Sequence, residues 1–407
     1  MTQQTIVSLA VAMLFVGTSV AQLPTDLPAH PAPDVGEAPA AAPIAPLPTN
    51  DGVNPGRLWF AADYLHGWMQ PAHLPPLVTT SPAGTPRAQA SVLGLPTTSV
   101  LFDGNVNDDL RAGLQLGAGY WLDSEQTFSA ELGFRVLESQ AALFSASSSG
   151  NPILARPFTN AVTGSAQSVV IAFPGGGSGS IFVRDRSGNF YDAHVDLTEQ
   201  ICRCNWIRLD GIVGYRFYRY DDGLHIRQSI SPTGAAFVPG TQVVTTDDFI
   251  AENEFNGFDL GLRLGFQAPR WSLDLLAKCA VGEVGSEVKI QGNQVTTVPG
   301  VAPVTRTGGA LALSSNIGTF ERREWQPFPE FGANISWQLT PRLQMRLGYT
   351  FLFLADIARA HDQVDLTINP SLFPPTTTPG AGNRPALNFT KGDAWIQTIN
   401  VGVAYTF

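Results

Sequence analysis

The sequence predicts an all-β fold, a transmembrane antiparallel up-and-down β-barrel of about 10–12 strands with short periplasmic turns and long external loops. Three observations predict it. Segments of the chain alternate apolar and polar residues with the period of a strand. The connections between them alternate between short and long. Charged residues make up only 14% of the chain, against about 25% in soluble domains, which fits a large lipid-facing surface.

The segment 395–407 shows the strand pattern most clearly, with the sequence WIQTINVGVAYTF. Apart from Gln397, its odd positions are apolar or aromatic, and small or polar residues stand between most of them. An amphipathic strand that closes on Phe407, with Tyr405 on the same face, is typical of the last strand of an outer-membrane barrel. We therefore expect Tyr405 and Phe407 to serve in closure and assembly, and 395–407 to pair antiparallel with 58–64.

The remaining strands are predicted from the same period. They are 58–64, 111–120, 128–136, 191–197, 207–217, 258–267, 271–281, 330–338 and 342–353. A length of about 10–13 residues suits a tilted crossing of the bilayer. The long connections contain further β-like pieces, which we expect to extend hairpins above the membrane or to add a pair of strands; these pieces are 168–173, 180–184 and 287–291.

The N-terminal region predicts export. Residues 1–21 combine an apolar run with the small residues expected before a signal-peptide cleavage site, although the first five residues carry no Lys or Arg. An N-terminal strand or helix of the mature fold is the alternative. The stretch 22–55 is rich in Pro and Ala without periodicity and predicts an extended linker. The barrel is then 56–407, and the expected location is the cell outer membrane after cleavage of the signal.

The alternate side chains of the predicted strands would point into the barrel. This inward set carries much of the charge of the chain, and both signs are present: Arg57, Asp63, Arg111, Glu131, Arg135, Asp192, Asp196, Arg208, Asp210, Arg216, Asp259, Arg263, Asp274, Lys278, Glu330, Arg342 and Arg346. They either form a salt-bridged plug or line a small water-filled pore with weak ion preference. Because wide aqueous channels need about sixteen strands, we expect a narrow, partly obstructed lumen.

Motifs for catalysis and metal binding are weak. Asp221-Asp222 and His361-Asp362 are expected beyond the external ends of strands, where ten-stranded outer-membrane proteases place an Asp pair facing a His-Asp pair. Such dipeptides carry little information, so we expect no enzyme. The run 103–109 offers oxygen ligands but lacks the glycine and glutamate positions of an EF-hand, which favours a solvated loop. We expect no metal and no cofactor.

The three cysteines predict no structural disulfide. Cys202 and Cys204 are one residue apart in an expected turn, where a disulfide would be strained. Cys279 falls on an apolar strand face and is expected to be a packed thiol.

Several loop phrases resemble a known family. The phrases are LPPLVTTSPAGTPRA (74–88), VLGLPTTSVLFDG (92–104), NDDLRAG (107–113), GYWLD (119–123), FSASSSGNPILARPF (144–158) and AFPGGGSGS (172–180). They are similar to the outer-membrane proteins of the "putative β-barrel porin-7" family, over nearly everything after the linker. The resemblance implies an outer-membrane barrel. Transport is presumed for that family from its fold, and because a fold alone does not fix function, the resemblance adds little about the substrate.

The expected function is therefore a narrow porin for passive passage of small solutes or ions. The alternative is a non-conducting surface or envelope barrel whose external loops bind a partner, and an outer-membrane protease is a distant third. Expected partners are outer-membrane lipid, the outer-membrane assembly machinery and small solutes or ions. A net charge of −10 argues against nucleic acid.

Overall fold

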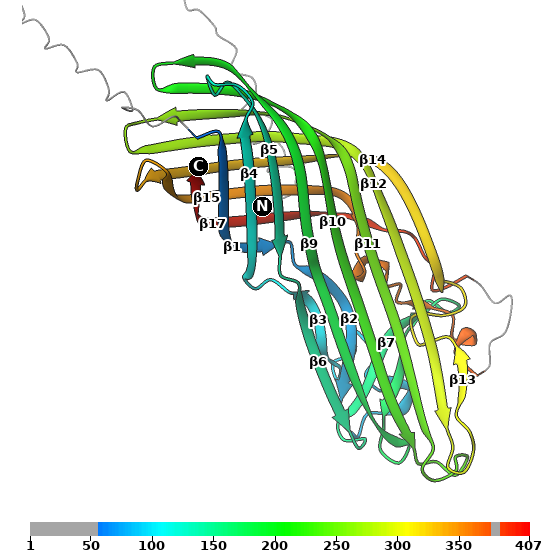
Figure 1. The fold of residues 1–407 in the computed structure, drawn as a ribbon. Helices are drawn as coiled ribbons and strands as arrows, with labels where there is room; N and C mark the ends of the chain where they lie inside the picture. Colours follow the sequence, from blue (N-terminus) through cyan, green and yellow to red (C-terminus); the bar gives the residue numbers. More distant parts are fainter. Residues whose placement is uncertain (1–55, 376–382) are drawn as a thin grey trace, which may run out of the picture. The chain divides into compact units, whose positions relative to one another are not determined.

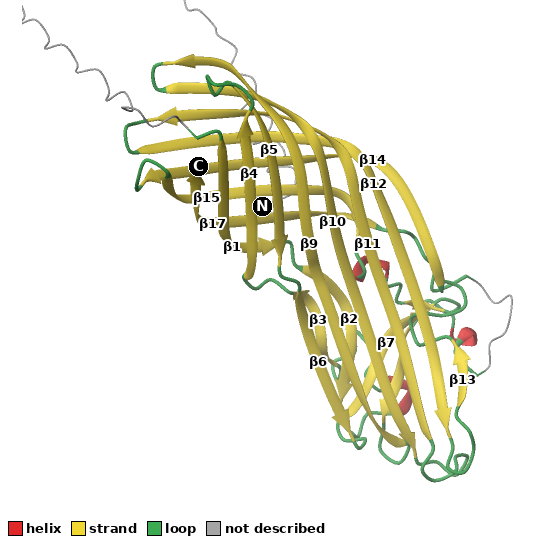
Figure 2. Cartoon of the chain, in the orientation of Figure 1, coloured by secondary structure: helices red, strands yellow, loops and turns green. Residues whose placement is uncertain are grey.

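The structure is a computed structural model, and it describes residues 56–375 and 383–407. These residues are mostly β-structure, with three short 3-10 helices (Figure 2). The predicted signal peptide and linker lie outside the described residues. None of the helices in the described ranges is long and apolar enough to cross a bilayer.

The elements follow one another along the chain as β1 (Leu58–Met69), β2 (Ala72–Ser81), η1 (Arg87–Gln89), β3 (Ser99–Val106), β4 (Arg111–Trp121), β5 (Phe128–Leu137), β6 (Gln140–Ser148), β7 (Ile153–Asn160), β8 (Ala166–Ala172), β9 (Gly177–Cys204), β10 (Ile207–Pro232), β11 (Gln242–Gln267), β12 (Trp271–Thr297), β13 (Val304–Thr307), β14 (Gly318–Gln338), β15 (Leu343–Ala358), η2 (His361–Gln363), β16 (Thr367–Ile368), η3 (Pro370–Leu372) and β17 (Lys391–Thr406).

Ten strands close into an antiparallel ring. Its hydrogen-bonded order is β9, β10, β11, β12, β14, β15, β17, β1, β4, β5 and back to β9, while β6 and β13 extend the sheet beside β9 and β12. Each of these ten ring strands contains one of the ten predicted strand segments, except for the terminal residues 342 and 407, which lie just outside β15 and β17. The first and last strands of the ring pair with each other, and Phe60 lies opposite Tyr405. The predicted barrel and the predicted pairing of 395–407 with 58–64 are confirmed.

The outer face of the ring is apolar and ends in aromatic residues. Trp206, Trp271 and Trp337 lie near the short turns and are 56%, 43% and 47% exposed. Toward the other end of the strands, Phe258 and Trp325 are each 67% exposed. An apolar band between two aromatic girdles is the surface that a lipid bilayer requires.

The four longest strands are each more than twice as long as predicted. β9, β10, β11 and β12 have 28, 26, 26 and 27 residues and run past the ring (Figure 1). Their extensions contain the predicted β-like pieces 180–184 and 287–291. Much of what was predicted as external loop is therefore strand.

The length was missed because the polarity of the alternation inverts along each strand. In β11, Phe258 and Leu260 are exposed on the outer face, whereas Glu254 occupies the outer face further along. On the inner face of the same extension, Phe249 and Ala251 are fully buried. The outer side chains face lipid near the short turns and water beyond it, so the apolar face changes sides.

A second sheet covers the inner face of these extensions. It has the order β16-β7-β2-β3, with β8 paired to β7 (Figure 1). Val78 and Leu154 of this sheet share one core with Ile226, Phe249 and Val288 of the long strands. The long connections after β1 and β5 thus fold into an external sheet with its own hydrophobic core.

The cysteine positions differ in part from the prediction. Cys202 and Cys204 are the last residues of β9 and are not in the turn, which is 205–206. Both are exposed free thiols, and Cys279 is a half-buried free thiol of β12.

Candidate functional site

The interior of the ring is organised around Arg216 of β10, which has no exposed surface. Its guanidinium contacts Asp192 of β9 and Glu330 of β14, and its Nη1 atom lies 3.8 Å from Oδ2 of Asp259 of β11. One cation therefore joins carboxylates from three other strands. Such a group is stable in a dry interior only because each charge has partners.

Two further cations complete this arrangement. Lys278 Nζ lies 2.6 Å from carboxylate oxygens of both Asp196 and Asp259. Arg135 Nη2 lies 2.9 Å from Oε1 of Glu330 and its Nη1 lies 3.7 Å from Oδ2 of Asp192. We call this set the ionic layer: Arg135, Asp192, Asp196, Arg216, Asp259, Lys278 and Glu330. All seven residues are buried, and they come from six of the ring strands.

An aromatic layer adjoins the ionic layer on its external side. It consists of Phe190, Tyr218, Phe255 and Phe328, each at most 1% exposed. The guanidinium carbon of Arg216 lies 4.5 Å from the ring centre of Phe328. Tyr218 stacks on Phe255 at 5.0 Å and meets Phe328 at 4.7 Å. The cation is thus enclosed by carboxylates and by an aromatic face.

The remaining predicted interior charges lie mainly toward the short turns. Arg263 bonds Glu131 through two N–H groups, at 2.9 and 2.7 Å. Arg208 bonds Asp210 at 2.7 Å and lies over the ring of Trp121. The first contact joins β11 to β5 across the ring, whereas Arg208 and Asp210 both belong to β10.

Three more predicted residues lie inside the ring with looser contacts. Asp63 is 1% exposed and lies 3.7 Å from the Nε atom of Arg346. Asp274 is half-buried.

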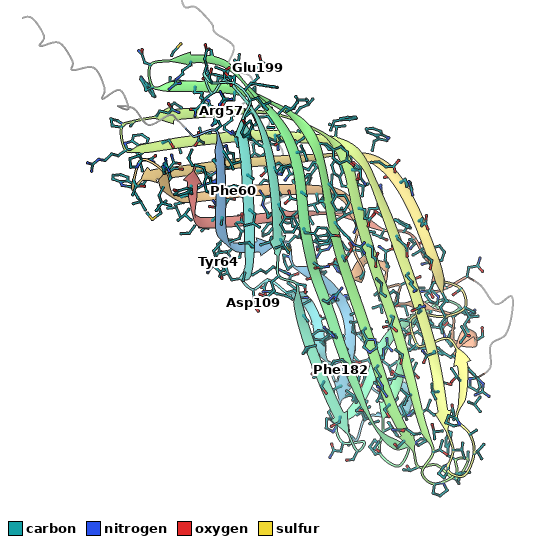
Figure 3. The ribbon with its side chains drawn as sticks, in the orientation of Figure 1. Arg57, Phe60, Tyr64, Asp109, Phe182 and Glu199 are labelled. Atoms are coloured by element: carbon teal, nitrogen blue, oxygen red, sulfur yellow. The ribbon has the colours of Figure 1, made fainter. Side chains whose placement is uncertain are left out.

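Arg57 and Arg342 were placed with the interior set but lie elsewhere. Arg57 precedes β1 (Figure 3). Arg342 belongs to the turn between β14 and β15, and both arginines are exposed. They follow the inward phase of the alternation, but the strand does not extend to them. They belong to the rim of the barrel and not to its interior.

A second polar cluster lies where the ring ends and the extensions begin. Arg111, which was predicted to face the lumen, is 1% exposed and donates to the backbone oxygens of Ser187 and Asn107 at 2.8 and 3.1 Å. Asn107 donates in turn to Asp185 at 2.6 Å. The run 103–109 is therefore not a solvated loop throughout, because it begins within β3 and contains the buried Asn107; only its last two residues are exposed without strand structure.

Arg359 ties the same cluster to the start of the external sheet. Its Nε donates to Oδ2 of Asp222 at 3.2 Å, and its other nitrogens donate to the backbone oxygens of Pro71 and Gln70. The backbone N–H of Gly188 donates to the other oxygen of Asp222 at 3.0 Å. Arg359 was not predicted as a site residue, because it lies after the end of β15, in a segment without a periodic pattern.

The residues considered for proteolysis are placed differently from the prediction. Asp221 and Asp222 lie within β10 and not beyond its end. Asp221 is bound by Arg219 at 3.0 Å and Asp222 by Arg359. His361 is buried, and burial together with the nearby Arg359 lowers its pKa to about 4.

Asp185 is the titratable group of this cluster whose pKa shift should have the clearest effect on the stability of the protein. It lies in the extension of β9, opposite Leu224 and outside the membrane band. Burial, reinforced by the nearby Asp222 carboxylate, raises the pKa of Asp185 to about 7, against the opposing effect of Arg359. The folded protein therefore holds a proton that the unfolded chain releases near pH 4.

Replacement of Asp185 by Asn is expected to remove this pH dependence. Because the pKa of Asp185 is raised in the folded protein, the free energy of unfolding of the parent is unaffected by this group below about pH 4. It then falls as the pH rises from about 4 to about 7, because the unfolded chain loses its proton first. The asparagine side chain has no proton to lose, so the free energy of unfolding of Asp185→Asn should rise relative to that of the parent by on the order of 3 kcal/mol between these two pH values. Urea unfolding at several pH values measures it, with the exposed Asp103→Asn as control. Parallel curves for parent and Asp185→Asn would contradict the prediction.

The ring and its interior define a class of protein. Ten antiparallel strands with an apolar outer band, two aromatic girdles and a charged interior make an outer-membrane β-barrel. The chain belongs to the family described as "Putative beta barrel porin-7 (BBP7)", whose model matches residues 59–407. The resemblance predicted from the loop phrases is confirmed, and the location is the outer membrane.

Two solved structures illustrate what the chain is similar to. The outer membrane protease OmpT from Escherichia coli is 11% identical, with a TM-score of 0.42, and the match covers 87% of this chain and 97% of that chain. A Pseudomonas aeruginosa FadL homologue is 10% identical, with a TM-score of 0.25 and coverage of 87% and 91%. Likeness at this level does not extend to function. Among curated proteins, none matches the chain in sequence.

Proposed function

We propose that this protein is a closed outer-membrane barrel that acts as an envelope component and carries a folded external sheet. The observation that supports it best is the burial of the ionic layer. Arg216 and Asp259 have no exposed surface in the middle of the ring. A water-filled lumen would leave such side chains accessible, whereas here each is held by partners from other strands.

The external sheet is the part of the molecule that can meet a partner outside the cell. Its core is shared with the long strands, so it is held in place and not carried on loose loops. We propose that its outer surface, together with the hairpin tips, binds that partner, and that no reaction is catalysed, because Asp221 and Asp222 are both engaged by arginines.

The ends of the strands that close the ring support a role in assembly. Phe407 is 57% exposed and contacts the rings of Phe60 and Tyr405 at 5.7 and 4.8 Å. We propose that Tyr405 and Phe407 present an aromatic end to the assembly machinery, while lipid covers the apolar band.

Planar-bilayer recording tests the closed barrel against narrow solute passage, which is the competing function. The full chain, inserted and checked by its heat-dependent mobility in gels, is expected to give no current steps above background. Arg346 is the probe for the competing function, because its side chain is 19% exposed inside the ring. Discrete steps whose reversal potential shifts in Arg346→Glu would overturn the proposal.

A further inference from the structure

The wall of the ring is interrupted between β14 and β15. Their backbone pairing runs from the turn to Glu330 opposite Leu352 and ends there. β14 nevertheless continues, paired with β12 alone, until Gly318 lies opposite Ile290. In the described chain, the stretch 318–329 of β14 therefore has a bonded neighbour on one side only.

The direction of the hydrogen bonds explains where the pairing ends. At the other end of β14, the N–H of Gln338 donates to the oxygen of Arg270 next to β12, and the N–H of Leu339 donates to the oxygen of Leu343 next to β15. Successive residues of a strand bond to opposite sides. Even-numbered residues of β14 therefore face β12 and odd-numbered residues face β15.

Two prolines occupy the next odd positions. Pro327 and Pro329 point their nitrogens toward β15, and proline has no N–H to donate. Continuing the register of the last bonded pair places Pro329 opposite Phe353 and Pro327 opposite Ala355. Two consecutive bonding positions thus lack donors. We call this unbonded stretch of wall the seam.

The seam lies at the depth of the external lipid leaflet. On the outer face of β14 it falls between Phe331, which is 44% exposed, and Trp325, which is 67% exposed and belongs to the external girdle. Backbone groups at this depth have no water to replace the missing bonds. Behind the seam the interior is apolar: Phe328, Leu352 and Leu354 are each at most 1% exposed.

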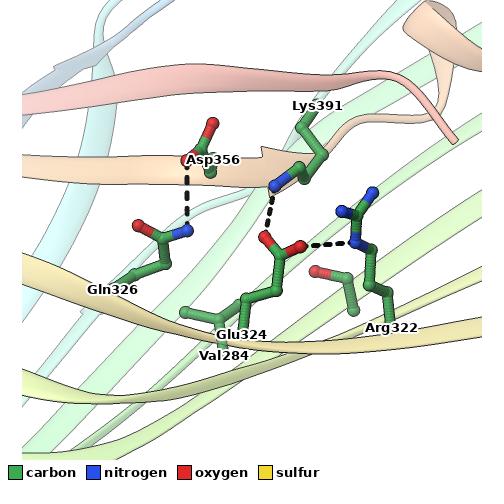
Figure 4. Close-up of a pocket in the computed structure, with 7 residues that line it drawn as sticks. Val284, Arg322, Glu324, Gln326, Asp356 and Lys391 are labelled. Carbon is green, nitrogen blue, oxygen red and sulfur yellow. Dashed lines mark hydrogen bonds and ion pairs between the residues drawn. The ribbon is translucent and has the colours of Figure 1, made fainter.

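Side chains hold the two strands together above the seam (Figure 4). Gln326 Nε2 of β14 donates to Oδ2 of Asp356 of β15 at 3.0 Å. Glu324 of β14 pairs with Lys391, which begins β17, and at 2.5 Å with Arg322 of its own strand. Together with Val284 and Ser286 of β12, these residues line a shallow polar depression. We call this group the clasp. It is made of polar side chains, which separate at lower cost than a backbone ladder.

We propose that the seam is a lateral binding site for a single hydrocarbon chain. The chain enters from the external leaflet between β14 and β15 and lies against Phe328 and Leu354, and its polar head lies at the clasp. The ionic layer lies on the periplasmic side of Phe328, so the site ends inside the barrel. This inference goes beyond the proposed function and is measured by lipid labelling, whereas the closed barrel is measured by conductance.

The test uses photolabelling of the full chain in proteoliposomes. Two diazirine probes are compared: palmitic acid, and a phosphatidylethanolamine with a diazirine acyl chain. Adducts are mapped to residues by mass spectrometry. Adducts on inward Phe328 or Leu354 with either probe support the site, and the probe that labels them identifies a free fatty acid or a lipid acyl chain as the source. Labelling of outward Phe331 and Tyr349 alone, with both probes, overturns it.

Variants that restore the backbone N–H groups missing at Pro327 and Pro329 test whether these prolines cause the seam. Pro327→Thr/Pro329→Thr should extend the β14–β15 ladder, slow backbone hydrogen exchange at Phe353 and Ala355 and reduce inward labelling by about tenfold, the shift that one or two backbone hydrogen bonds produce. Pro341→Thr, in the turn of the same hairpin, should change neither. Unchanged inward labelling in a variant with slowed exchange overturns the proposal.

A disulfide across the clasp provides a second variant if the proline variant does not fold. Gln326→Cys/Asp356→Cys is made in a background in which the three native cysteines are replaced by Ser. Oxidation should abolish inward labelling and reduction should restore it. Ser336→Cys/Arg346→Cys, placed at directly opposed residues where the two strands are paired, is the matched control. Inward labelling that persists in the oxidised clasp variant overturns the site.

Discussion

Replacing Arg216 with Met lowers the free energy of unfolding by an expected 3–5 kcal/mol, roughly the loss seen when one partner of a buried ion pair is removed. The substitution leaves Asp192, Asp259 and Glu330 buried without their common cation. Because the barrel has no water at this level, these carboxylates must then take up protons or distort the ring. Urea titration of the protein in vesicles, followed by gel mobility, measures the loss.

The matched control is Arg227→Met, since Arg227 is an exposed residue of the same strand β10. Its effect should be within about 0.5 kcal/mol. Adding Glu330→Gln to Arg216→Met removes one of the orphaned charges and should recover part of the stability. A loss below about 1 kcal/mol for Arg216→Met would show that the ionic layer is hydrated and the interior open.

Arg156→Met is expected to release the external sheet while the ring stays folded. Nη1 of Arg156, on β7, lies 2.6 Å from Oδ2 of Asp247 on β11, and both residues are at most 2% exposed. The other oxygen of Asp247 accepts the backbone N–H groups of Ala310, Leu311 and Ala312. One carboxylate thus joins the second sheet, a long strand and the segment after β13. Removal of Arg156 leaves this carboxylate buried without its cation and should destabilise the external sheet locally by about 3–5 kcal/mol.

Limited proteolysis of intact vesicles measures this effect. Cleavage within β2, β7 and β8 should accelerate in Arg156→Met, whereas the gel mobility of the ring should not change. Arg306→Met, at an exposed residue of β13, serves as the control. Equal cleavage rates in the parent and in Arg156→Met would mean that apolar packing alone holds the sheet.

The strands of the ring could be predicted because lipid imposes the pattern. A residue such as Leu260 has to be apolar, and its neighbour Asp259 has no contact with lipid, so the period is strict. The upper halves of β9 to β12 carry the inverse pattern with mixed residues, in which Arg227 and His225 face water. No single window of sequence shows both halves as one strand. The second sheet escaped prediction for a related reason, because its short strands pair across long connections.

The interior site could be predicted as a set of charges but not as a set of contacts. The period alone places Arg135 and Glu330 inward, yet they are 195 residues apart and meet only because their strands share the ring. Arg156 and Asp247 were missed, since both lie in regions predicted as loop. The seam was also missed: two prolines in a predicted strand weaken it, and only the direction of each N–H shows which neighbour loses its bonds.

The inverted polarity of the long strands also fixes the height of the protein in the membrane. In β11 the change from Glu254 to Phe258 on one face spans a few residues, and in β12 it lies between Val281 and Glu283. A displacement by two residues, about 7 Å along the tilted strand, would bring carboxylates into hydrocarbon or lift aromatic residues into water. The change of polarity along the strands therefore fixes how deeply the barrel is inserted, and this keeps the external sheet at a constant distance above the lipid surface.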